Sequence, residues 1–136
     1  MADFTLDQRL ENDSVVIGDL TLCQLRLHKN GAFPWVMLIP KRDNIVEILD
    51  LTDDDQDILW NEIIFVSTIM KKLFKPTKLN VANLGNIVPQ LHVHVVARYS
   101  DDKAWPGPIW NSGVKRDYEL DEAEALIKQL KAAFAL

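Results

Sequence analysis

The run Gln90-Leu91-His92-Val93-His94-Val95-Val96 constrains the fold of this chain more than any other segment, because it contains two of the three histidines in the sequence. Successive side chains of a β-strand point to opposite faces of a sheet. Gln90, His92 and His94 would therefore line one face, and the apolar residues between them would pack into a core. The polar face predicts a functional site, since a row of amide and imidazole groups does nothing for packing.

The size of the chain predicts a single domain over residues 1–136. Of its 136 residues, 48% are apolar, which is enough for one sizeable core and too little for two. No apolar run approaches the length of a membrane span, and the N-terminus lacks the layout of a signal peptide, so we expect a cytoplasmic protein without a membrane partner. The single cysteine, Cys23, lies among apolar residues, which favours a buried thiol.

The net charge of −5 at pH 7 argues against general nucleic-acid binding, because domains that bind nucleic acids usually carry a basic excess. A small anionic substrate remains compatible with this charge. It needs only a few local donors, for which Lys41, Arg42 and Arg98 are candidates.

Hydrophobic periodicity predicts an α+β fold. Segments of β type occur at residues 15–17, 20–28, 35–40, 78–83 and 91–98. Apolar residues at three- and four-residue steps predict a long helix that follows the N-cap Thr52 and ends before Pro76. Further short helices are expected at residues 6–10 and 121–134, the second opened by a capping box of Asp121 and Glu124.

From these elements we expect an antiparallel sheet of about five strands with the long helix packed on one face. The other face, or its end, is then left for the polar row. Residues 99–113 contain Trp105-Pro106-Gly107-Pro108-Ile109-Trp110, which cannot form a regular element. Because exposing two indole rings is unfavourable, we expect this loop to fold back over the domain.

The spacing of His92 and His94 suits a single phosphate, since residues two apart on a strand lie roughly 6 to 7 Å apart. If one ring nitrogen of His92 donates to a backbone carbonyl, the other nitrogen is unprotonated and can attack phosphorus. His94 and Gln90 would then hold the phosphate oxygens, or donate protons to them, from either side.

The run resembles the signature of the histidine triad superfamily, His-x-His-x-His-x-x with apolar residues at each x, in which the middle histidine is the nucleophile. Here the middle position is His92, the third is His94, and the first is replaced by Gln90. Residues 35–42 are similar to the family's strand ending in Ile-Pro-Lys, and residues 81–85 to its Asn-x-Gly segment. With Trp105-Pro106-Gly107-Pro108 the resemblance covers roughly residues 15–110, and residues 85–94 resemble a bacterial branch with glutamine in the first position.

This resemblance implies a nucleotide hydrolase or nucleotidyltransferase that acts on the α-phosphate of a nucleotide conjugate, such as a phosphoramidate or a dinucleoside polyphosphate. His92 would form a nucleotidyl-histidine intermediate that water captures, with His94 and Gln90 as the other catalytic residues. The resemblance also implies a homodimer, and it calls for neither a cofactor nor a metal.

Four residues are candidates for nucleotide binding. By position in the resemblance, Asn83 matches the family's asparagine near the phosphate and ribose, and Asn30 falls near its acidic ribose contact. Arg98 shares the strand parity of the two histidines, which would suit a phosphate contact. Trp105 is included from the proline-rich loop, although it can equally close the edge of the core.

Two departures from the family pattern leave the substrate class less defined than the reaction type. The Gly-Gln-Ser stretch that many relatives carry before the triad is missing between Gly85 and Gln90. The histidine that relatives often place just before the Ile-Pro-Lys strand is Trp35 here, which we interpret as a packing residue.

Two other functions fit the same residues. A triad with glutamine in its first position can bind a nucleotide and turn it over poorly. A metal enzyme would use His28, His92 and His94 as three ligands, since His-x-His on a strand serves zinc enzymes in this way. That hypothesis needs His28 to reach the same face, whereas its place at a strand end favours a solvated or capping residue.

Overall fold

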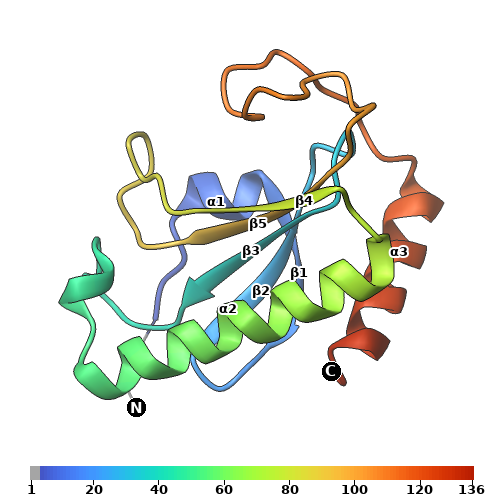
Figure 1. Cartoon of the computed structure of the whole chain (residues 1–136). Helices are drawn as coiled ribbons and strands as arrows, with labels where there is room; N and C mark the ends of the chain where they lie inside the picture. Colours follow the sequence, from blue (N-terminus) through green and yellow to red (C-terminus); the bar gives the residue numbers. More distant parts are fainter. Residues whose placement is uncertain (1–3) are drawn as a thin grey trace.

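A five-stranded antiparallel sheet in the order β1-β2-β3-β5-β4 forms the centre of the computed structural model, which describes residues 4–136. Figure 1 shows the long helix α2 crossing one face of this sheet. The strands are β1 (Ser14–Asp19), β2 (Cys23–His28), β3 (Trp35–Pro40), β4 (Lys78–Ala82) and β5 (Val93–Arg98). The helices are α1 (Gln8–Asn12), α2 (Asp53–Phe74) and α3 (Leu120–Ala133), with one 3-10 turn, η1 (Ile48–Asp50). The expected α+β fold is confirmed.

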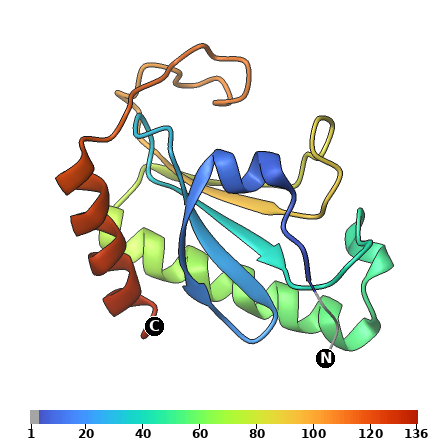
Figure 2. The ribbon, with the colours of Figure 1, turned by 180° about the vertical axis from the view of Figure 1, so that it is seen from behind.

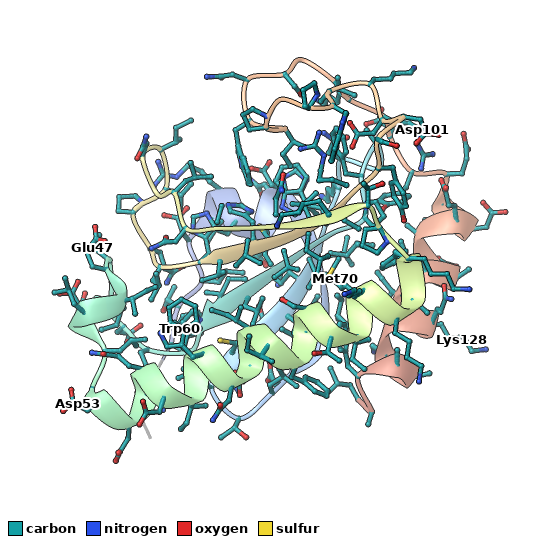
Figure 3. All side chains as sticks on the ribbon, in the orientation of Figure 1. Glu47, Asp53, Trp60, Met70, Asp101 and Lys128 are labelled. Atoms are coloured by element: carbon teal, nitrogen blue, oxygen red, sulfur yellow. The ribbon has the colours of Figure 1, made fainter. Side chains whose placement is uncertain are left out.

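The helix α2 forms where the sequence predicts it. The hydroxyl of Thr52 accepts the backbone N–H of Asp55 at 3.2 Å, which caps the first turn. The helix ends at Lys75, whose φ of 49° is left-handed, directly before Pro76. Its buried stripe includes Leu59, Ile63, Val66 and Met70, and Figure 3 labels Met70 on the side of α2 that faces the sheet.

Strand alternation divides the core into two layers. On β5, Val93, Val95 and Ala97 are buried in the cluster that includes the α2 stripe. The alternate residue Val96 joins a second cluster on the opposite face. This second cluster also contains residues of β3, of α1 and of the loop at 104–114, which cover that face: Leu10, Phe33, Trp35, Met37, Ile39 and Ile109 are its buried members. Figure 2 shows α1 on this side of the sheet.

Several element boundaries differ from the prediction: β1 spans Ser14–Asp19 rather than 15–17, β2 begins at Cys23 rather than at residue 20, and three further differences follow from particular hydrogen bonds. The first helix begins at Gln8 because the side chain of Asp7 accepts the backbone N–H of Arg9 and so caps it. The last helix begins at Leu120, since its capping box is formed by Glu119 and Glu122 rather than by Asp121 and Glu124.

The third difference concerns the polar row itself. The strand β5 begins at Val93, two residues later than expected, and its pairing with β3 likewise starts there. The N–H of Leu91 is donated outside the sheet, to the carbonyl of Ile45 at 2.9 Å. Gln90 and His92 therefore precede the strand that carries His94.

None of the helices in residues 4–136 is both long and apolar enough to span a membrane.

Candidate active site

The three histidines of the chain line one pocket of about 350 Å³ on the sheet face opposite α2. His28 ends β2, His94 lies on β5, and His92 directly precedes β5. Trp35 and Met37 of β3 contribute to the floor, and Leu10, Trp110 and residues 84–88 contribute to the walls. A larger, more open hollow of about 740 Å³ between α2 and the C-terminal residues contains no histidine, so the chemistry favours the smaller pocket.

A backbone carbonyl fixes the tautomer of His92. Its Nδ1 lies 2.7 Å from the backbone carbonyl oxygen of Gln90. Because a carbonyl can only accept, Nδ1 carries the proton and Nε2 keeps its lone pair. Burial lowers the pKa of His92, while the Gln90 carbonyl and the carboxylate of Asp7 oppose that shift.

His94 accepts a hydrogen bond from an indole. Trp35 donates its Nε1–H to Nδ1 of His94 at 2.9 Å. The rings of His92 and His94 meet edge to face with their centroids 4.8 Å apart. Burial, followed by the proximity of His92 and His28, lowers the pKa of His94 to about 3, so this imidazole is neutral at physiological pH.

His28 belongs to the pocket, which corrects its interpretation as a solvated residue. Its ring is partly buried and stacks on Trp35, with centroids 3.6 Å apart and planes 5° from parallel. The expected capping contact is present, since Nδ1 of His28 accepts the backbone N–H of Asn30 at 3.0 Å. Burial, and then the proximity of His92 and Lys115, lowers the pKa of His28 to about 4.

The metal hypothesis required His28 to reach the other two histidines, and it does reach the same pocket. Within residues 4–136, however, no group of three or more histidine, cysteine or acidic side chains is arranged to hold a metal ion.

The side chain of Gln90 was expected to face the pocket beside the histidines, but it points elsewhere. Its Oε1 accepts the backbone N–H of Asp7 at 2.8 Å, and its Nε2 donates to the carbonyl of Thr5 at 2.9 Å. The amide thus fastens the segment that leads into α1. What Gln90 supplies to the pocket is its backbone carbonyl, which fixes the proton on His92.

Arg98 is a structural residue, which corrects its proposed phosphate contact. It is 1% exposed, and its guanidinium donates to both carboxylate oxygens of Asp102, at 2.8 and 3.0 Å, and to Asn80. The guanidinium also lies 5.4 Å from the ring centroid of Phe33 and 5.7 Å from that of Trp105. Arg98 and Trp105 therefore pack against each other, and the indole of the loop that lines the pocket is Trp110.

The two asparagines also differ from the expectation. The amide of Asn30 organises its own loop, accepting the N–H groups of Ala32 and Arg116 and donating to the carbonyl of Val114. Asn83 is exposed directly after β4 and lies outside the pocket lining. The neighbouring residues 84–88 form that wall instead, through a turn in which Gly85 has a φ of +88°.

Three ring-bearing residues of the pocket had no predicted catalytic or nucleotide-binding role: His28, which was considered only as a metal ligand or a solvated or capping residue, Trp35 and Trp110. For His28 and Trp35, the alternation of side chains along a strand could have predicted their place on this face of the sheet. His28 ends a strand on the face of Gln24 and Arg26, and Trp35 begins a strand whose other residues alternate in the same way. No local pattern distinguished Trp110 from Trp105, since both flank the same prolines.

A second hollow of about 450 Å³ adjoins the pocket and shares its wall of His28, Trp35 and Trp110. It differs in its charged groups, because Lys29 and Lys115 line it together with the carboxylates of Asp13 and Asp117. The two hollows therefore share a wall, and His92 and His94 line the first while the two lysines line the second.

Comparison with known proteins gave a family match and close structural neighbours. The family model described as HIT domain matches residues 9–101. A histidine triad protein from Bradyrhizobium japonicum is 40% identical with a TM-score of 0.95, over 98% of this chain and 99% of that one. A histidine triad (HIT) protein from Sinorhizobium meliloti 1021 is 42% identical with a TM-score of 0.92, over 96% of each chain. One from Marinobacter aquaeolei VT8 is 36% identical with a TM-score of 0.95, over 98% of each chain. No curated protein sequence matches.

Proposed function

We propose, because this chain belongs to the histidine triad (HIT) domain family, that its histidine pocket acts on the α-phosphate of a nucleotide conjugate. Family membership agrees with the resemblance found in the sequence. The HIT fold generally acts on nucleotides, and the superfamily includes both hydrolases and transferases.

The contact that carries the proposal is the one between Nδ1 of His92 and the Gln90 carbonyl, at 2.7 Å. It fixes the tautomer in which Nε2 is a nucleophile. Attack forms a bond from Nε2 to phosphorus, and the bond to the leaving group breaks. The leaving group departs with the electron pair and takes up a proton from solvent, so that an amine leaves in its neutral form. The ring then becomes positively charged, and the same carbonyl stabilises that charge through the Nδ1 proton.

The nucleotide is released when the bond between phosphorus and His92 is hydrolysed. An oxygen of water attacks phosphorus and releases a proton to solvent, the bond from phosphorus to Nε2 breaks, and its electron pair returns to the imidazole. The products are a nucleoside monophosphate and the starting form of the enzyme. A second nucleophile in place of water makes the protein a transferase.

The lining of the pocket favours a substrate with little charge beyond one phosphate. Among the described residues that line it, none is lysine or arginine, and Asp13 adds a carboxylate. Consecutive phosphates would meet no cation next to the histidines, so a phosphoramidate is favoured over a dinucleoside polyphosphate. The lysines of the adjoining hollow lie beyond the aromatic wall.

One observation favours the alternative of a nucleotide-binding module. The Gln90 amide is engaged by Thr5 and Asp7, which leaves His94 as the imidazole beside the nucleophile. A phosphate with fewer donors around it is less stabilised in the transition state, so binding with poor turnover is the competing outcome.

Trapping of a covalent histidine adduct distinguishes a nucleotide hydrolase or transferase from a nucleotide-binding module. The protein is incubated with a panel of purine phosphoramidates, adenylylated amines and dinucleoside polyphosphates, then digested at neutral pH and sequenced by mass spectrometry. Trypsin places His28 in the peptide 27–29 and both other histidines in the peptide 79–98. We expect a nucleoside monophosphate adduct whose fragments assign it to His92, and no adduct or product above background in His92→Ala.

An adduct on His94 or His28 would contradict the proposed nucleophile. Nucleotide binding by the wild-type protein, with no adduct and no product from any member of the panel, would instead establish the binding module. The adduct mass identifies the transferred nucleotide.

We also propose a homodimer, as the family resemblance implies. The strand β4 is at an edge of the sheet, and its Val81 is 46% exposed. An edge strand has unpaired backbone groups that a second copy can bind.

A further inference from the structure

The contact between Trp35 and His94 restricts the chemistry of His94. An indole nitrogen carries a hydrogen and can only donate, so Nδ1 of His94 must be the acceptor. In the neutral ring the remaining proton then sits on Nε2. A histidine or a hydroxyl at position 35 could exchange donor and acceptor roles with His94, but an indole cannot.

The indole itself is held from three sides. Trp35 is 7% exposed, and its backbone lies in β3, paired with Val96 of β5. One face of its ring is stacked against His28 at 3.6 Å. The ring of Trp110 approaches edge to face, with centroids 6.0 Å apart and planes 82° from parallel. These contacts leave the Nε1–H a single direction, toward β5.

The Nε2 atom of His94 is free to meet a ligand. It has no hydrogen-bond partner among the described residues. In residues 4–136, the only fully buried side-chain nitrogen or oxygen without a partner is Oγ of Ser67, so Nε2 of His94 is not fully buried. The Nε2–H of His94 therefore opens into the pocket, beside the ring of His92.

We propose that Trp35 is a positioning residue, whose indole N–H holds His94 in the tautomer that presents Nε2–H to the phosphate. The proposal rests on the proposed function and names how its second imidazole is prepared. His94 acts as a fixed, neutral hydrogen-bond donor to a non-bridging phosphate oxygen, and it keeps its proton throughout the reaction. The low pKa of His94 agrees with a ring that stays uncharged.

The direct test measures the tautomer without any nucleotide. Long-range ¹H–¹⁵N spectra of the whole protein distinguish a protonated Nε2 from a protonated Nδ1. We expect His94 in the wild-type protein to be protonated on Nε2 alone. Replacing Trp35 with 3-benzothienylalanine keeps the shape of the bicyclic ring and changes only N–H to sulfur, and it should give a mixture of both tautomers. An unchanged tautomer in this variant would overturn the proposal.

The kinetic test follows adduct formation on His92. The sulfur isostere and Trp35→Phe should lower the maximal rate about tenfold, the cost of one hydrogen bond, with KM within about twofold. Trp35→His should recover part of this loss, because an imidazole N–H can donate to His94. The control is Leu49→Ala in η1, where the side chain is 76% exposed and lies outside the pocket lining, and its rate should equal that of wild type.

An isostere that reacts as fast as wild type would refute the positioning role even if His92 is the nucleophile. If no substrate labels His92 in the wild-type protein, the proposed function fails, and the tautomer measurement still decides whether Trp35 controls His94. The two failures are therefore distinguishable.

Discussion

Burial lowers the pKa of each imidazole in the pocket, since a dry environment disfavours the charged ring. The three residues nevertheless differ in what their nitrogens can do. The ring of His92 has a proton fixed on Nδ1 by a carbonyl, whereas in His28 and His94 the same atom accepts from an N–H. A free lone pair on Nε2 is thus particular to His92. The proposal of His92 as the nucleophile thus rests on the hydrogen-bond partner of each Nδ1 atom rather than on the residue type.

The first prediction concerns the pH dependence of His92. Only the neutral ring attacks, and its pKa is lowered, so kcat/KM should be constant near pH 7 and fall only at a pH below the ordinary histidine value of 6.5. The carboxylate of Asp7 stabilises the protonated ring and is itself charged over this range, because the adjacent Arg9 lowers its pKa. Asp7→Asn removes that charge and keeps an N-cap residue, so it should move the acid limb of the profile to still lower pH.

The control for this change is Asp53→Asn, which removes one carboxylate at the start of α2, the end labelled in Figure 3, and should leave the acid limb in place. An acid limb that moves upward in Asp7→Asn, or that lies at the ordinary histidine value in the wild-type protein, would show that the ring is not tuned in this way.

At the scale of the elements, the long helix was predictable because three local signals agree. The Thr52 cap, the apolar stripe and Pro76 each depend on neighbours within a few residues. The start of β5 was not predictable from its own sequence. Leu91 alternates correctly for a strand, yet its N–H pairs with Ile45, and that contact is distant in the chain. Local patterns thus define an element better than they define its ends.

The residues of the candidate site likewise differ in whether local sequence predicts their role. The pair of His92 and His94 was found because its members are two residues apart. The strand parity of Arg98 was correct, but its function depends on Asp102 and Asn80, which satisfy the guanidinium. For Trp35, the hydrogen-bond partner lies 59 residues further along the chain, so no sequence pattern indicates its role.

The ion pair that follows β5 gives a prediction on stability. Asp102 binds Arg98 and also accepts the N–H groups of Tyr99, Ala104 and Trp105, which ties the loop to the end of the strand. The side chains of the pair are 2% and 9% exposed. Asp102→Asn leaves a buried guanidinium without its countercharge, so the free energy of unfolding in urea should fall by about 3 to 5 kcal/mol.

The comparison is Asp19→Asn, which removes the carboxylate of an exposed pair with Lys41 at 3.7 Å. An exposed pair contributes about 0 to 1 kcal/mol, so this variant should unfold close to wild type. Equal losses in the two variants would mean that the Arg98 pair does not hold the loop.

At the scale of the whole molecule, the two faces of the sheet differ in what covers them. One face is buried under α2, and the other carries the histidine pocket under α1 and the loop that contains Trp110. The two edges also differ, because α3 contacts β1 while β4 is the edge at the opposite side. Figures 1 and 2 show α3 on the far side of the molecule from the loop that joins β4 and β5.

The exposed apolar residues of α2 divide between its two flanks. Phe65, on the flank toward the C-terminal residues, contacts Phe134. The spacing of 3.6 residues per turn places Trp60 and Ile64 one turn apart on the opposite side. Their exposed fractions are 52% and 63%, and with Val81 of β4 they form an apolar border at this edge.

This border predicts where the proposed homodimer forms. Ile64→Glu places a charge among apolar residues, so it should convert a dimer to a monomer in light scattering coupled to gel filtration. The matched control is Leu120→Glu, at a residue 78% exposed at the start of α3, which should leave the mass unchanged. A wild-type protein that is monomeric at micromolar concentration would contradict the dimer. A dimer that survives Ile64→Glu and dissociates in Leu120→Glu would instead assign the interface to the α3 side of the sheet.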